Sequence, residues 1–180
     1  MKSISLIFDR DGTLIKHIPY LQDPEKVELL PYVKSTLKIL FDLKIKIFLH
    51  TNQSGISRGY FKLIDALRCN QKMKELIGIN NKLFLEECIS VGNDFKNDKF
   101  RKPSPFFGNK ILKKYNLDKN LMYYVGDSIS DLKTAQNIGC KGIGINTGLI
   151  KFDNSILKEE NINVKIIDSF KDILEIISKN

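Results

Sequence analysis

Short apolar runs alternate along this chain with longer stretches in which apolar residues recur every three or four positions. The apolar runs predict buried strands at 4–8, 45–49, 84–89, 121–125, 141–145 and 164–167. The periodic stretches predict helices at 31–43, 58–77, 105–115, 130–138 and 169–178. Strands that alternate with helices build βαβ units, in which helices cover both faces of a mostly parallel sheet. The sequence therefore predicts an α/β fold.

Length and composition bound the architecture and the location of the chain. Its 180 residues are 42% hydrophobic and 28% charged, which suits one globular domain over 1–180. No apolar run approaches the roughly 18 residues that span a bilayer. The first apolar run leads directly into charged residues, unlike a signal peptide. Three widely spaced cysteines form no disulfide or metal pattern. We expect a cytoplasmic monomer with no membrane partner.

The formal net charge of +8 admits two interpretations. A lysine-rich solvated surface is the plainer one. Attraction for polyanions, such as sugar bisphosphates or nucleic acid, is the sharper one. Lysines are spread along the chain rather than gathered in one stripe, which weakens the case for a nucleic-acid partner.

Two acidic clusters follow predicted strands, and ligands of α/β sheets bind at the carboxyl ends of strands. Asp9 and Asp11 follow the first run and point the same way in an extended chain, and Gly12 then allows a sharp turn. An acidic turn that caps a loop would also explain this pair, but it predicts no second cluster. Asp127 follows the fourth run, and Asp131 after it suits a helix cap as well as a metal site.

Polar and basic residues follow other predicted strands. Hydroxyl and amide donors that suit phosphate oxygens come from Thr51, Asn52, Gln53 and Ser54, although an ordinary polar loop looks similar. Arg101 and Lys102 precede a predicted helix. Together these groups suffice for phosphoryl transfer. One carboxylate can attack phosphorus, and a second can protonate the leaving oxygen and then activate water. Magnesium and a lysine can neutralise the phosphoryl oxygens.

The chain resembles the haloacid dehalogenase (HAD) superfamily of phosphatases over residues 8–131. The resemblance is carried by Asp-Arg-Asp-Gly-Thr at 9–13, by Thr51, by Lys102 and by Gly-Asp at 126–127. Three longer runs are similar to the branch of D-glycero-D-manno-heptose 1,7-bisphosphate phosphatases and histidinol phosphatases: 8–13, 51–59 and 101–103. The resemblance implies a Rossmann-like three-layer sandwich without a large cap domain. Only the stretches 14–30 and 90–104 could then close over the site.

The resemblance also implies roles. Asp9 would be the nucleophile and, with Asp127, a magnesium ligand. Asp11 would be the general acid and base and would give its backbone carbonyl to the metal. Thr51 and Lys102 would hold the transferring phosphoryl group. The groups that would contact the substrate are Tyr20, Asn52, Gln53, Ser54 and Arg101.

One departure from the branch concerns a zinc-binding loop. Many members carry Cys-x-His and then Cys-x-Cys just before Arg-Lys-Pro. Here Asp98 and Phe100 occupy the two later cysteine positions, and the expected histidine is missing. We therefore expect no zinc, and a loop 90–104 that is held by packing. His17 and His50 have no partner at ligand spacing, so we interpret both as structural or incidental.

The implied activity is magnesium-dependent hydrolysis of a small phosphomonoester, with heptose 1,7-bisphosphate as the first expectation and an aspartyl-phosphate on Asp9. Histidinol phosphate fits the same branch. A polynucleotide 3′-phosphatase shares two of the signatures and would suit the positive charge. Arg10 between the aspartates, and the lack of an evident aromatic and basic stripe, favour the sugar phosphate. A non-catalytic binding protein would usually lack the nucleophile or the metal carboxylates, and here all are present.

Overall fold

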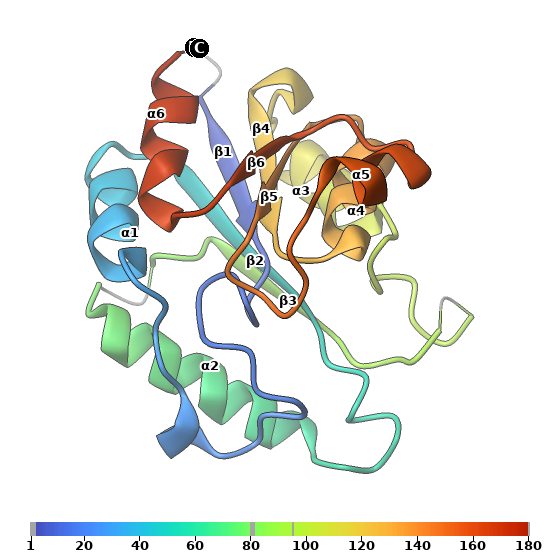
Figure 1. Cartoon of the computed structure of the whole chain (residues 1–180). Coiled ribbons are helices and arrows are strands. Elements are labelled where there is room, and N and C mark those ends of the chain that lie inside the picture. The colour runs from blue at the N-terminus through green and yellow to red at the C-terminus, as the bar shows by residue number, and fades with distance from the viewer. Residues whose placement is uncertain (1–2, 80–81, 95, 180) are drawn as a thin grey trace.

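A six-stranded parallel sheet forms the centre of the computed structural model, which describes residues 3–79, 82–94 and 96–179 (Figure 1). Its strands lie in the order β3-β2-β1-β4-β5-β6, and each neighbouring pair is parallel. Their bounds are β1 Ser5–Phe8, β2 Lys46–Asn52, β3 Glu86–Ser90, β4 Met122–Gly126, β5 Lys141–Ile145 and β6 Lys165–Ile167. The predicted α/β fold with a mostly parallel sheet is confirmed.

Helices cover both faces of the sheet (Figure 1). Their bounds are α1 Val33–Asp42, α2 Leu63–Ile77, α3 Phe106–Lys114, α4 Ile129–Ile138, α5 Asn154–Glu159 and α6 Ile173–Ser178. The alternation of side chains along β1 explains the two cores. Leu6 and Phe8 belong to the cluster that packs on α1, α2 and α6, and Ile7 belongs to the cluster formed with α3 and α4. The predicted three-layer sandwich is therefore present.

Several predicted element bounds need correction. The helix expected at 58–77 begins only at Leu63, because Gly59 has φ +76° and the Asp65 carboxylate accepts a hydrogen bond from the Lys62 N–H. Strand β2 runs on to Asn52, three residues beyond the predicted end. The last helix, expected from 169, begins with a 3₁₀ turn at Phe170–Asp172.

Three short elements were not expected. Helix α5 is only six residues long and is capped by Asp153, whose carboxylate accepts a hydrogen bond from Ile156 N–H. The 3₁₀ turns η1 and η2 occupy Pro24–Lys26 and Lys119–Leu121. Elements this short carry too little periodicity to be recognised in a sequence.

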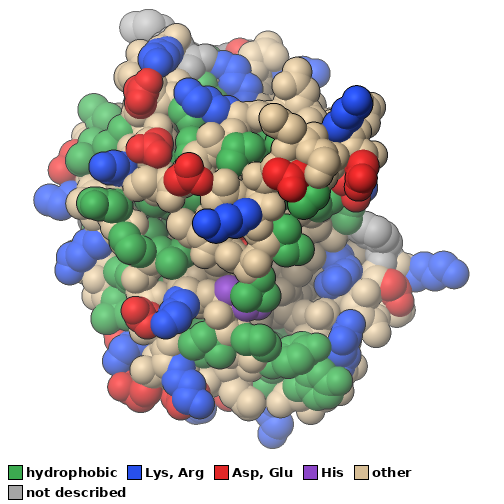
Figure 2. Space-filling view, in the orientation of Figure 1, with side chains coloured by type: hydrophobic (Ala, Val, Ile, Leu, Met, Phe, Trp, Pro, Cys, Tyr) green, Lys and Arg blue, Asp and Glu red, His purple; other side chains and the backbone are tan. Residues whose placement is uncertain are grey.

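The region between β1 and α1 is small. It contains the turn η1 and an isolated antiparallel bridge between Ile15 and Leu29. Within the described residues, no helix is long and apolar enough to cross a bilayer. Figure 2 shows lysine and arginine side chains interspersed with acidic ones over the face drawn there, rather than gathered in one stripe.

Candidate active site

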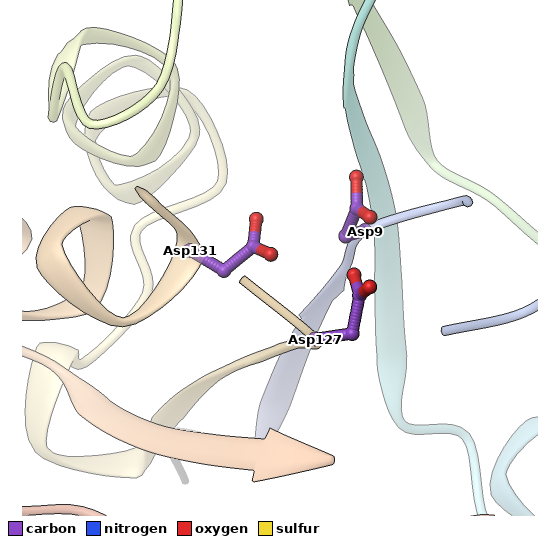
Figure 3. A group of neighbouring side chains, drawn as sticks. All are labelled: Asp9, Asp127 and Asp131. Carbon is purple, nitrogen blue, oxygen red and sulfur yellow. The ribbon is translucent and has the colours of Figure 1, made fainter. Parts of the chain in front are cut away.

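Three carboxylates meet where β1 and β4 end. Asp9 follows β1 and donates its N–H to the Val125 carbonyl at 2.9 Å, which places it beside Asp127 at the end of β4. Asp131 comes from the first turn of α4. Figure 3 shows the Asp127 and Asp131 side chains pointing toward Asp9, and one oxygen of each carboxylate lies within 4.8 Å of the others. All three residues are buried.

Burial of these like charges shifts their proton affinity. Burial raises the pKa of Asp9 from 3.8 to about 7 against the opposing positive charge of Lys102, and the negative charges of Asp131 and Asp11 add to the rise. The pKa of Asp127 rises to about 9, again through burial first and then through Asp9 and Asp131. A cation would relieve this repulsion.

The chemistry of the donors fits magnesium, which prefers carboxylate and carbonyl oxygens. Space at Asp127 is kept free by two glycines. A Cβ on Gly12 would lie 2.2 Å from Asp127 Oδ2, and one on Gly148 would lie 1.8 Å from the same oxygen. Gly12 also has φ +81°, a backbone conformation that other residues rarely adopt. The residues at these strand ends therefore suit a divalent cation.

Lys102 provides the positive charge of the site. Its Nζ donates to Asp9 Oδ1 at 2.5 Å and to Asp131 Oδ1 at 2.6 Å, and its side chain is almost fully buried. Burial acts to lower the pKa of Lys102, but the two carboxylates outweigh it and raise the pKa, so the ammonium stays charged.

Asp131 takes part in the cap of α4, one of the two roles that its position in the sequence left open. Its Oδ2 accepts from the Ser128 N–H at 3.0 Å and from Ser128 Oγ at 2.6 Å, which caps α4. Its Oδ1 faces Lys102 and the other carboxylates. The cap therefore fixes the carboxylate that anchors the lysine.

Asp11 lies outside the group of three carboxylates. Both of its oxygens accept hydrogen bonds from the Arg10 guanidinium, and Oδ2 also accepts from Gln53 Nε2 at 2.9 Å. Arg10 is fully buried and donates to Asn70 Oδ1 on α2 at 2.9 Å. Sequence reasoning used Arg10 only to mark a branch. Its contact with Asp11 leaves no signal in the sequence, because β1 ends at Phe8 and the alternation of a strand does not extend to residues 9–11.

The polar residues at the end of β2 and just after it lie around Lys102 and Asp11. Gln53 Nε2 donates to Thr51 Oγ1 at 2.9 Å as well as to Asp11. Asn52 Oδ1 accepts from the Lys102 N–H at 3.0 Å, and Asn52 Nδ2 donates to the Lys102 carbonyl at 3.3 Å. Asn52 thus fixes the backbone of the lysine.

Most of the predicted site residues line one cavity of about 370 Å³. Those in its lining are Asp9, Asp11, Tyr20, Thr51, Asn52, Gln53, Ser54, Lys102 and Asp127. Tyr20 is 45% exposed and its ring meets the edge of Tyr60 at 4.6 Å between centroids. His17, interpreted from the sequence as structural or incidental, also lines this cavity.

Arg101 is the predicted site residue that does not line the cavity. Its Nη1 donates to the Gly92 carbonyl at 3.0 Å. Burial lowers the pKa of Arg101, and the nearby positive charge of Arg58 adds to that shift. Arg58 Nη1 in turn donates to the Tyr20 hydroxyl at 3.2 Å. Arg58 therefore contacts Tyr20 at the edge of the cavity, and Arg101 lies near Arg58.

Hydrogen bonds to Asp98 hold loop 90–104, which we expected to be held by packing. The Asp98 carboxylate accepts four hydrogen bonds within the loop, from Ser90 Oγ and from the N–H groups of Val91, Gly92 and Phe100. His50 is structural, as interpreted from the sequence. It bridges the Tyr124 hydroxyl and the Phe100 carbonyl, and burial lowers its pKa to about 3.

Comparisons with known proteins point to one family. Residues 99–173 match the HAD-hydrolase-like family. A D-glycero-β-D-manno-heptose-1,7-bisphosphate 7-phosphatase of Pseudomonas aeruginosa is 30% identical over 145 residues, which cover 79% of this chain and 81% of that protein. The histidine biosynthesis bifunctional protein HisB of Blochmanniella floridana is 32% identical over 77% of this chain and 40% of its own length.

A solved structure has the same fold along nearly the whole chain. It is a D,D-heptose 1,7-bisphosphate phosphatase from B. bronchiseptica, complexed with magnesium and phosphate. Its TM-score is 0.85 at 23% identity, and the match covers 99% of both chains.

Proposed function

The chain belongs to the HAD-like hydrolases, in their heptose-bisphosphate phosphatase branch, and from this premise we propose a magnesium-dependent 7-phosphatase of D-glycero-D-manno-heptose 1,7-bisphosphate. The relatives of this branch are phosphatases, and so is this chain. One observation carries the proposal. Asp9, Asp11, Thr51, Lys102 and Asp127 line a single cavity at the carboxyl edge of the sheet.

In the first step, a carboxylate oxygen of Asp9 attacks the phosphorus of the substrate. A bond forms between that oxygen and phosphorus, and the bond from phosphorus to the sugar oxygen breaks. Asp11 gives its proton to the departing sugar oxygen. Lys102 Nζ, already 2.5 Å from Asp9 Oδ1, neutralises charge on the phosphoryl oxygens, and the Thr51 hydroxyl donates to them.

In the second step, a water molecule attacks the phosphorus of the aspartyl-phosphate. Asp11 takes a proton from that water, and the bond between phosphorus and Asp9 breaks, so that inorganic phosphate leaves. Asp11 is then protonated again and Asp9 is free. The Asp11 side chain is 16% exposed and lines the cavity, which gives water and the leaving oxygen access to it.

Magnesium would be held by Asp9, by Asp127 and by the backbone carbonyl of Asp11. When bound, it supplies positive charge that keeps Asp9 ionised and stabilises charge on the transferring group. The raised pKa values of Asp9 and Asp127 support this proposal, because these carboxylates lack a sufficient counter-charge from the protein alone. The capped Asp131 balances Lys102.

A rim beside the cavity, formed by Tyr20, Arg58 and Arg101, supports the choice of a substrate with a second phosphate. Arg101 and Arg58 are close enough for Arg58 to lower the pKa of Arg101. Two like charges at such a distance favour an anion beside them. The Tyr20 hydroxyl accepts a hydrogen bond from Arg58, and Tyr20 lines the cavity, so a second phosphate of a bound substrate could reach Arg58 past Tyr20. A bisphosphate can satisfy the inner site and this rim together.

Histidinol phosphate is the second candidate, because the HisB relative shares much of the chain. Its single phosphate would leave the rim arginines without an anionic partner. A 3′-phosphorylated polynucleotide would need a basic track for the remaining strand. The interspersed charges on the face in Figure 2 offer no such track there.

A comparison of three substrates tests the proposal. The purified protein with Mg²⁺ would receive heptose 1,7-bisphosphate, histidinol phosphate or a 3′-phosphorylated oligonucleotide, and kcat/KM would be measured by phosphate release. We expect the bisphosphate to exceed the others by about 100-fold, as an additional charge-assisted contact suggests. A higher kcat/KM for histidinol phosphate would assign the chain to that activity instead.

A further inference from the structure

Asp98 holds the loop that carries Lys102, and it does so through one carboxylate. Its Oδ2 accepts from Ser90 Oγ at 2.8 Å, from Val91 N–H at 2.8 Å and from Gly92 N–H at 3.1 Å. Its Oδ1 accepts from Phe100 N–H at 2.9 Å. The carboxylate therefore ties the end of β3 to the residues just before Lys102.

The link continues from Phe100 to Lys102. The Phe100 carbonyl accepts from His50 Nε2 at 2.8 Å, so the Phe100 peptide is held on both sides. Two residues later, the Lys102 N–H and carbonyl both bond to Asn52. Asp98 and β2 thus fix the backbone from which the Lys102 ammonium reaches Asp9 and Asp131.

The backbone at Gly92 approaches Asp98 closely. A Cβ on Gly92 would lie 2.4 Å from Asp98 Cβ, so this position requires glycine. Asp94, in the same loop, bonds locally as far as the described residues show. Its carboxylate accepts hydrogen bonds from Asn97 N–H and Asn97 Nδ2, each at 2.9 Å. Asp94 is therefore a matched control for the loss of one carboxylate.

We propose that Asp98 is a positioning residue for phosphoryl binding. Its carboxylate links the end of β3 to Phe100 and thereby fixes the position of Lys102, which binds the phosphoryl group. The proposal rests on the proposed function, because it assigns Lys102 to the phosphoryl group. An amide at position 98 has a single acceptor oxygen and no charge. Asp98→Asn would therefore lose hydrogen bonds that a charged acceptor strengthens.

The experiment compares Asp98→Asn with Asp94→Asn in the full chain with Mg²⁺. Hydrogen exchange would follow the amides of Val91, Gly92 and Phe100. Calorimetry would give the dissociation constant of inorganic phosphate, and p-nitrophenyl phosphate would give kcat. We expect Asp98→Asn to speed exchange, to weaken phosphate binding about tenfold and to lower kcat about tenfold, the size of one charge-assisted hydrogen bond. Asp94→Asn should match the wild type in all three.

A double-mutant cycle separates positioning from a general loss of structure. In a Lys102→Met background, Asp98→Asn should change phosphate binding less than twofold, because the group that it positions is gone. An equal loss of phosphate affinity in both backgrounds would overturn the proposal, as would unchanged affinity in the single variant. Ser90→Ala, which removes one donor to Asp98, replaces Asp98→Asn if that variant does not fold, and we expect about a threefold loss.

The same data keep this proposal apart from the proposed function. A wild type that hydrolyses no phosphomonoester with Mg²⁺ would refute the phosphatase mechanism. The phosphate-binding measurements and the double-mutant cycle would still test whether Asp98 positions Lys102. A wild type that binds no phosphate would refute this positioning role.

Discussion

The inner part of the site and the rim beside the cavity are built in different ways. The inner part consists of Asp9, Asp127, Asp131 and Lys102, which are all buried and are fixed by strand ends, a helix cap and ion pairs. The rim consists of Tyr20, Arg58 and Arg101, which are exposed or half-buried, lie on loops and are held by single hydrogen bonds. In the proposed function, the inner part carries out the reaction and the rim selects the substrate.

The largest effect should come from the inner part, through Asp9. Asp9→Asn removes the nucleophile and should lower kcat by about four orders of magnitude or more. It should form no covalent phosphoenzyme. Asp11→Asn keeps the nucleophile, so an activated aryl phosphate should still give a phosphoenzyme that hydrolyses slowly. Rapid quench and mass measurement of the protein would detect it. A burst of phenol from Asp9→Asn would instead favour direct attack by water.

The second-largest effect should come from a substitution at Gly148, which lies against Asp127 in the inner part. Gly148→Ala would place a methyl group 1.8 Å from Asp127 Oδ2, so the carboxylate must move. We expect Mg²⁺ affinity to fall about 10- to 100-fold, as when a supporting contact of a metal ligand is lost. The Mg²⁺ dependence of the rate would measure it. Leu149→Ala, at the next and strongly exposed position, should leave the dependence unchanged.

A smaller effect is expected at the rim. Arg101→Ala should raise KM about tenfold for a bisphosphate and change kcat less than about twofold, because uniform binding is lost. The same change should scarcely affect p-nitrophenyl phosphate, which has no second phosphate. Arg68→Ala, on the surface of α2, serves as the control for loss of a positive charge. A fall in kcat without a change in KM would place Arg101 among the groups that act on the transition state.

The smallest expected effect is the dependence of stability on pH and magnesium. In the folded protein without metal, the pKa values of Asp9 and Asp127 are raised from 3.8 to about 7 and about 9. The folded state then binds protons more tightly than the unfolded state, so these groups stabilise it below about pH 4, and the stabilisation is lost as pH rises from there to about 9.

Thermal unfolding with EDTA or with Mg²⁺, at pH 5 and pH 8, tests this sign. We expect Mg²⁺ to raise Tm by a few degrees more at pH 8, on the order of 4 °C. The reason is that bound cation replaces the protons that the carboxylates lose. An Asp127→Asn variant should lose most of this difference between the two pH values. An equal shift at both pH values would argue against a metal at these carboxylates.

The sequence predicted carboxylates of the inner part, but it did not predict the contacts that hold the site in place. Asp9 and Asp127 could be predicted because parallel strands bring their carboxyl ends to one edge of the sheet. The partnership of Arg10 with Asn70 could not, since 60 residues separate them and only the packing of α2 joins them. The Asp98 contacts were missed for a related reason. A carboxylate that accepts backbone N–H groups leaves no pattern in the sequence beyond one polar residue in a loop. The expected absence of zinc stays a prediction, for elemental analysis to test.

The position of β3 at the edge of the sheet has a consequence for how such enzymes diversify. Loop 90–104 leaves from the end of this edge strand, whereas Asp9 and Asp127 follow two interior strands. A loop at the border can be lengthened, shortened or exchanged between homologues without breaking the register of the interior strands. Transplanting such a segment with Gly92, Asp98 and Lys102 kept should therefore change substrate selection without removing the lysine that reaches Asp9.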